Sequence, residues 1–190
     1  MFRASSIVAS LMIGAAYLAP LTASAQVRTE LRDPVRGVSF HSVELSEMPI
    51  NALEVIEGSF PDSDQLAIGL SAMHLDGRDA IDEYVLWIRH QGRRWLDFAV
   101  EDPVVFTIDN QPLALSQLRA SQPFVGETGR LFEKIEFSLS DEQLSRILSG
   151  DITVITLSSD NGTVRKRLNA QELVYLREFR DRLAADLTGT

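Results

Sequence analysis

Residues 84–90 limit the possible folds most strongly, because they read Tyr-Val-Leu-Trp-Ile-Arg-His. β-Branched and aromatic residues without Gly or Pro favour a largely buried β-strand. Gly92 follows as a turn residue, residues 95–98 are expected to return beside the strand, and residues 104–108 continue it. We therefore expect this stretch, which carries both tryptophans, to form the middle of a β-rich core.

Alternation of apolar and polar residues predicts further strands elsewhere in the chain. They are expected at residues 37–46, with a bend near Ser42, and at residues 65–74, 132–139 and 152–157. Residues 53–57 fit either a strand or one helical turn. Residues 119–130 hold two Gly and one Pro without a regular period, which predicts a long loop.

Two capping boxes predict helices late in the chain. Ser140 with Gln143 begins a helix near residues 141–148, and Asn169 with Glu172 begins one near residues 170–187. The second helix is expected to cover an open end or face of the sheets. The connection through residues 140–151 either joins parallel neighbours or carries the chain between two sheets.

The pair Asn161-Gly162 is the strongest hairpin signal in the sequence. As a two-residue loop, it pairs Ile155 with Leu168 and Leu157 with Lys166. The opposite face would then carry Thr156 opposite Arg167 and Ser158 opposite Arg165. With its short strands and late helices, the chain is expected to be mainly β (α+β), an antiparallel β-sandwich-like domain.

The first 25 residues resemble a cleaved export signal. Arg3 precedes an apolar stretch at residues 7–19, and Ala23-Ser24-Ala25 fits a cleavage site before Gln26. An uncleaved anchor is the alternative, but Pro20 and the short apolar stretch argue against it. We expect a flexible lead-in at residues 26–36, one globular domain at residues 37–187, and a periplasmic or secreted location.

Composition restricts the chemistry further. The 190 residues are 45% hydrophobic with a formal net charge of −9, and Cys is absent. No disulfide, thiolate nucleophile or Cys-ligated metal is therefore possible. The overall acidity and the export signal also argue against binding to nucleic acid.

A basic cluster surrounds the turn after the central strand. Arg89, His90, Arg93 and Arg94 crowd this turn beside Trp95. Arginine forks bind carboxylate or phosphate, and an indole ring offers a stacking surface, so the cluster is a candidate anion-docking site. The alternative is a solvated turn whose Trp95 belongs to the core.

A second basic surface is expected near the C-terminus. Residues 164–182 hold six basic and three acidic residues, whereas residues 41–64 hold six acidic residues and no Lys or Arg. Arg165 and Arg167 are therefore candidates for binding an anionic envelope component or an acidic protein. Internal pairing between the two segments is the alternative.

Other chemical motifs are weak. Asp76, Asp79 and Asp82 lie in one acidic turn, but their spacing does not match a calcium loop. The histidines at positions 41, 74 and 90 have no zinc-site spacing, so we expect no metal and no cofactor. No arrangement typical of nucleophilic catalysis is visible.

These features favour an exported binding or interaction domain without catalytic activity, whose partner is an unknown protein or an anionic envelope component. One alternative is a hydrolase of an envelope polymer that uses the carboxylates of Asp76, Asp79 or Asp82. Another is a structural subunit of an oligomer. The sequence does not identify the ligand, the pathway, the oligomeric state or the strand order.

Overall fold

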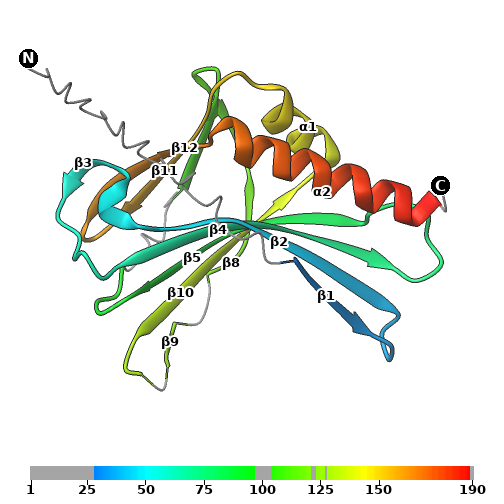
Figure 1. Cartoon of the computed structure of the whole chain (residues 1–190), viewed down its shortest axis with the longest axis horizontal. Helices are drawn as coiled ribbons and strands as arrows, with labels where there is room; N and C mark the ends of the chain where they lie inside the picture. Colours follow the sequence, from blue (N-terminus) through cyan, green and yellow to red (C-terminus); the bar gives the residue numbers. More distant parts are fainter. Residues whose placement is uncertain (1–27, 97–103, 121–122, 127, 189–190) are drawn as a thin grey trace, which may run out of the picture.

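The computed structural model describes residues 28–96, 104–120, 123–126 and 128–188, which form two packed antiparallel sheets with two α-helices (Figure 1). The first sheet contains β1 (Arg28–Asp33), β2 (Val38–Pro49), β4 (Gln65–Leu75), β5 (Glu83–Gly92), β8 (Ser116–Ala120), β9 (Phe124–Val125) and β10 (Leu131–Leu139). The second contains β3 (Glu54–Gly58), β6 (Val104–Ile108), β7 (Gln111–Leu113), β11 (Thr153–Ser159) and β12 (Gly162–Arg167). A 3-10 turn, η1 (Ile50–Ala52), and the helices α1 (Asp141–Ser149) and α2 (Ala170–Thr188) complete the fold. The expected mainly β, sandwich-like architecture with two late helices is confirmed.

Strand order explains how the two sheets connect. The first sheet runs β1-β2-β4-β5-β10-β8, with β9 also on β10, and the second runs β3-β12-β11-β6-β7. Helix α1 follows β10 of the first sheet and precedes β11 of the second. Of the two alternatives for this connection, the chain therefore passes between sheets.

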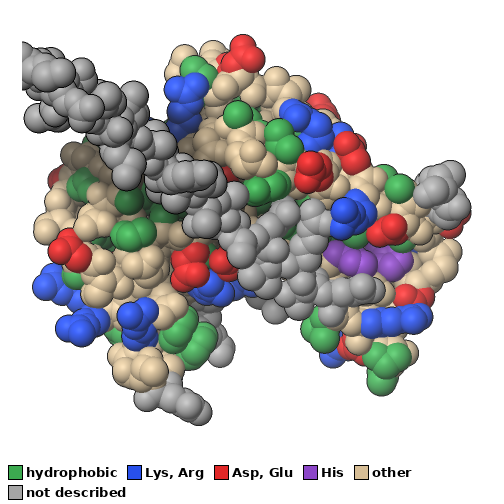
Figure 2. Space-filling model, in the orientation of Figure 1, with side chains coloured by type: hydrophobic (Ala, Val, Ile, Leu, Met, Phe, Trp, Pro, Cys, Tyr) green, Lys and Arg blue, Asp and Glu red, His purple; other side chains and the backbone are tan. Residues whose placement is uncertain are grey.

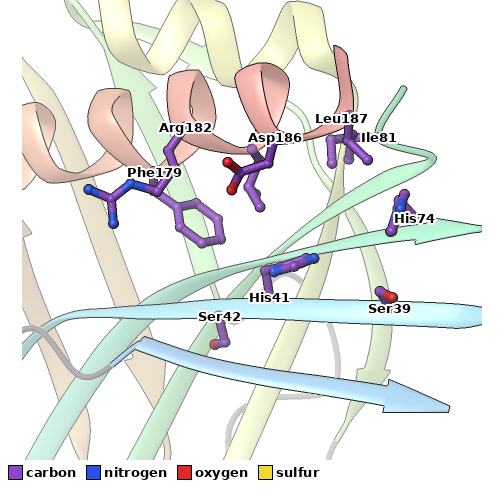
Figure 3. A pocket seen from close by; sticks show the side chains of 10 residues that line it. Ser39, His41, Ser42, His74, Ile81, Phe179, Arg182, Asp186 and Leu187 are labelled. Atoms are coloured by element: carbon purple, nitrogen blue, oxygen red, sulfur yellow. The ribbon is translucent and has the colours of Figure 1, made fainter. Parts of the chain in front are cut away.

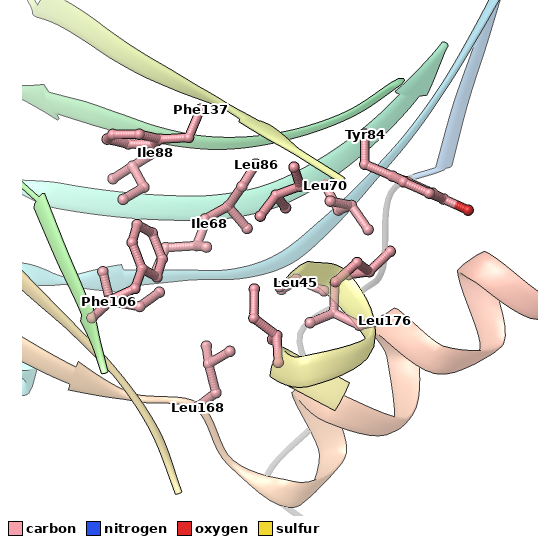
Figure 4. Packing of buried hydrophobic residues seen from close by; sticks show 14 of the residues in the cluster. Leu45, Ile68, Leu70, Tyr84, Leu86, Ile88, Phe106, Phe137, Leu168 and Leu176 are labelled. Atoms are coloured by element: carbon pink, nitrogen blue, oxygen red, sulfur yellow. The ribbon is translucent and has the colours of Figure 1, made fainter. Parts of the chain in front are cut away.

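The core lies where the inner faces of the two sheets meet (Figure 4). Ile68 and Ile88 of the first sheet and Ile155 of the second are fully buried. Phe106 of β6 packs edge-to-face on Phe137 of β10, with ring centroids 5.6 Å apart. Alternation along each strand directs these residues to one face, so burial of that face holds the layers together.

Helix α2 passes over the β2 side of the first sheet (Figure 1). Its buried stripe consists of Leu176, Phe179 and Leu183, as the helical period predicts. Both capping boxes are confirmed. At the start of α2, Glu172 N–H donates to the Asn169 side chain, while a Glu172 carboxylate oxygen accepts from Asn169 N–H.

The predicted central strand is β5, which lies between β4 and β10. Trp87 is only 7% exposed, but it lies on the outer face of the sheet, where Gly69 of β4 leaves room for the indole. Trp95 is half-buried and belongs to no strand. The expected return strand is wrong at residues 95–96, because β4 and β10 already occupy both edges of β5; residues 97–98 lie outside the described residues.

Several segments are more regular than the sequence predicts. Residues 28–33, expected in a flexible lead-in, form β1 and pair with β2. Part of the expected loop at residues 119–130 belongs to β8 and β9, which pair with β10. Residues 54–58 form a strand, β3. Each of these segments is a short strand or an edge strand that is stabilised by pairing with a neighbouring strand. Such pairing leaves little signal in the local sequence.

The predicted hairpin at residue 161 forms, but with a different register. Ser159 pairs with Gly162 and Ile155 with Lys166, so the two-residue loop is Asp160-Asn161. Gly162 is required inside the ladder, because a Cβ there would lie 2.1 Å from the Glu57 carbonyl oxygen of β3. The shift of two positions keeps Arg165 and Arg167 on the predicted outer face.

Neither described helix has the length and apolar character needed to cross a membrane. The predicted export signal at residues 1–25 lies outside the described residues.

Candidate functional site

The predicted basic cluster after β5 divides between two environments. Arg89 points to the outer face of the first sheet, where it forms a 3.1 Å ion pair with Glu44 and lies 5.8 Å from the Trp87 ring centroid. Arg93 and Arg94 are exposed directly after the strand, beside the half-buried Trp95. Arg89 therefore supports sheet packing, while the other two arginines face solvent.

Arg165 and Arg167 lie on the outer face of the second sheet, and both are exposed. Arg165 forms an ion pair with Glu54 of β3 at 3.4 Å, which is the internal pairing considered as the alternative. The second sheet carries these residues and the first sheet carries Arg89, so the structure does not bring the predicted basic groups into one site.

The three candidate catalytic carboxylates lie in the turn between β4 and β5. Asp82 accepts from Leu75 N–H and pairs with Arg78, while Asp76 forms a 2.7 Å ion pair with Arg32. The hydrogen bond from Arg32 lowers the pKa of Asp76. Asp79 is exposed. The carboxylates do not converge on one point, and no group of three metal-binding side chains occurs among the described residues.

His90, expected at a basic surface turn, is instead completely buried. Its Nδ1 lies 3.1 Å from a carboxylate oxygen of Glu133, and its Nε2 lies 3.7 Å from Asp64. Glu133 also accepts from Leu96 N–H at 2.6 Å, and Asp64 accepts from Arg93 N–H at 3.3 Å. The cluster thus fixes the chain as it leaves β5 through the N–H groups of Arg93 and Leu96. Nε2 of His90 and one carboxylate oxygen of Asp64 are buried without a hydrogen-bond partner among the described residues.

A groove of about 440 Å³ lies between α2 and the first sheet (Figure 3). We call it the α2 groove. Its strand side consists of Ser39, His41 and Ser42 of β2 and His74 of β4. Ser39, His41 and His74 continue the inward-facing alternation of the core strands past the point where the second sheet ends, so polar groups replace core residues there.

The helix side of the α2 groove is mostly apolar. It consists of Phe179, Arg182, Leu183, Asp186 and Leu187, and Ile81 closes one end. Phe179 and Leu183 belong to the buried stripe of α2. The charged residues follow at the next positions of the helix, because side chains three and four residues apart share a face.

Two histidines meet on the strand side. The rings of His41 and His74 lie with centroids 6.0 Å apart and planes tilted by 51°. Nδ1 of His74 is buried and has no hydrogen-bond partner among the described residues. A buried polar atom without a partner is costly. Ser46, Asp64 and His90 each carry one buried atom in the same state.

The helix supplies opposite charges. Arg182 and Asp186 are exposed, and neither forms an ion pair with a described residue. Figure 3 shows both side chains projecting from neighbouring turns of α2, on the side of the helix that carries Phe179. In the space-filling view, histidine side chains reach the surface beside the C-terminal half of α2 (Figure 2). The groove thus carries one basic residue, one acidic residue and an apolar wall.

Sequence reasoning missed this site because its residues are distant along the chain. His74 does continue the alternation of Leu66, Ile68, Leu70 and Ala72 on one face of β4. A histidine in a core-facing position is a usable signal, but the sequence does not show which helix covers it. The meeting of β2, β4 and α2 is a tertiary feature.

Comparison with known proteins gives no match: no family model matches the chain, and neither does any curated protein sequence.

Proposed function

We propose that the protein is an exported, non-catalytic binding domain, and that the α2 groove binds a small zwitterion with an apolar side group, such as an amino acid. The observation that carries this proposal is that Arg182 and Asp186 lie one helical turn apart, beside the apolar residues that line the same groove. The export signal expected at residues 1–25 supports a location beyond the cytoplasm.

Each part of such a ligand has a complementary group. The guanidinium of Arg182 matches a carboxylate, because its N–H groups form a fork. Asp186 accepts from an ammonium group, and Phe179 and Leu183 contact the apolar portion. The volume of about 440 Å³ lies within the ordinary range for small-molecule sites.

Opposite charges favour a zwitterion over a simple anion. A ligand with only a carboxylate would be attracted by Arg182 but repelled by Asp186. A simple amine would be attracted by Asp186 but repelled by Arg182. Binding is favoured over hydrolysis because Asp76 pairs with Arg32 and Asp82 accepts from Leu75 N–H, so Asp76, Asp79 and Asp82, the carboxylates of the hydrolase alternative, do not converge on one point.

Titration calorimetry with L-leucine and L-phenylalanine tests the proposal. Removing one charge by Arg182→Gln or Asp186→Asn should weaken binding at least about tenfold, the value of one charged hydrogen bond. Glu178→Gln is the matched control, because Glu178 is exposed on the same helix outside the groove. The affinity of the Glu178→Gln variant for both amino acids should equal that of the unmodified protein.

Two analogues of phenylalanine test the charge requirement from the ligand side. 3-Phenylpropionate lacks the ammonium group and phenethylamine lacks the carboxylate, so both should bind more weakly than phenylalanine. Equal affinity for all three compounds, or equal affinity of the three variants for phenylalanine, would contradict the proposed recognition.

A further inference from the structure

The β9–β10 hairpin ends in an exposed apolar pair. Phe124 is 59% exposed and Val125 is 61% exposed. Phe124 stacks on Phe132 with ring centroids 4.8 Å apart and planes 8° from parallel. Gly126 N–H donates to the Arg130 carbonyl oxygen and closes the turn. The pair thus lies on a projecting hairpin, seen at the lower end of Figure 1, where Phe132 supports the ring of Phe124.

Three arginines surround this end of the first sheet. Leu131 pairs with Gly92, so Arg130 and Arg93 are the next residues beyond the last pair of β10 and β5. Arg93, Arg94 and Arg130 are all exposed, and none forms an ion pair with a described residue. Figure 2 shows Lys and Arg side chains gathered over this end with a hydrophobic patch beside them.

The acidic groups that the structure describes near this end are mostly occupied. Glu133 and Asp64 point into the buried cluster around His90, and Asp62 accepts from Asn51 on the neighbouring segment. The described part of this surface is therefore basic, although the chain carries a net charge of −9. A basic rim around exposed apolar side chains is the arrangement that binds anionic membrane interfaces.

We propose that the surface formed by Phe124, Val125, Arg93, Arg94 and Arg130, here called the hairpin tip, docks on an anionic lipid bilayer. The apolar pair enters the interface while the arginines contact lipid phosphates. An anionic polymer or acidic peptide would use the arginines, but it would not require a projecting Phe-Val pair. The α2 groove lies toward the opposite ends of β2 and β4, so it stays accessible when the tip is docked.

Vesicle co-sedimentation of the purified protein tests this surface. Binding is expected to vesicles of 30% phosphatidylglycerol in phosphatidylcholine, and not to pure phosphatidylcholine. Replacing the three arginines by Gln should reduce the partition coefficient about a hundredfold, roughly fivefold for each. Phe124→Ser with Val125→Ser should reduce it at least about tenfold.

Matched variants on the second sheet control for general charge and apolar exposure. Arg165→Gln with Arg167→Gln, and Ile56→Ser at an exposed position of β3, should leave binding within about twofold of the unmodified protein. Circular dichroism checks that each variant is folded. Absence of binding to the anionic vesicles would overturn the proposal. So would equal losses in the control variants, or a loss that follows the arginines but not Phe124 and Val125, which would indicate an anionic polymer instead.

Discussion

Phe106→Ala should lower the free energy of unfolding by about 3–5 kcal/mol. Phe106 is 2% exposed on β6 of the second sheet, and its ring packs edge-to-face on Phe137 of β10 in the first sheet. Truncation removes this contact and leaves a cavity between the sheets. Ladder hydrogen bonds hold the backbone of both layers in place, so the cavity closes only partly. Urea unfolding monitored by circular dichroism measures the change.

Val105→Ala is the control for this prediction. Val105 precedes Phe106 on the same strand but points outward and is 43% exposed, so its truncation should change the free energy of unfolding by less than about 1 kcal/mol. If the two variants were destabilised equally, β6 would not pack against the first sheet as described.

The second large effect is expected at the buried cluster. Glu133→Ala should lower the free energy of unfolding by about 3–5 kcal/mol, because it leaves His90 Nδ1 and Leu96 N–H buried without their shared acceptor. Glu133→Gln keeps an acceptor oxygen while removing the charge, so its loss should be smaller. The same urea experiment measures both variants.

Glu136→Ala is the matched control on β10. Its carboxylate pairs with Lys134 at the solvent-facing side of the sheet, where an ion pair contributes at most about 1 kcal/mol. A loss at Glu136 equal to that at Glu133 would contradict the structural role given to the buried cluster.

Local signals in the sequence predicted much of the fold. The alternation in residues 65–74 gave β4, and Ser140-Gln143 and Asn169-Glu172 gave both helix starts, because each capping contact lies within four residues. Register was harder. The two-residue loop is Asp160-Asn161, one position before the predicted Asn161-Gly162. Gly162 instead lies inside the ladder against Glu57 of β3, which is more than 100 residues away in sequence.

The candidate sites were less predictable, because burial and the arrangement of the sheets determine which side chains come together. His90 reads as part of a basic turn, yet it faces the core because β5 alternates and Glu133 lies beside it. Arg93 and Arg94 were correctly placed after the central strand, but their neighbour Arg130 is brought there by strand pairing. Whether these arginines bind a ligand stays a prediction.

The most direct test of the proposed binding site is an NMR titration of histidine-labelled protein with L-phenylalanine. The chain contains three histidines, of which His41 and His74 line the α2 groove and His90 is sealed in the buried cluster. The account predicts saturable shifts of the His41 and His74 imidazole signals while the His90 signal stays in place. Unchanged signals from His41 and His74, or a shift of His90 as large as theirs, would contradict it.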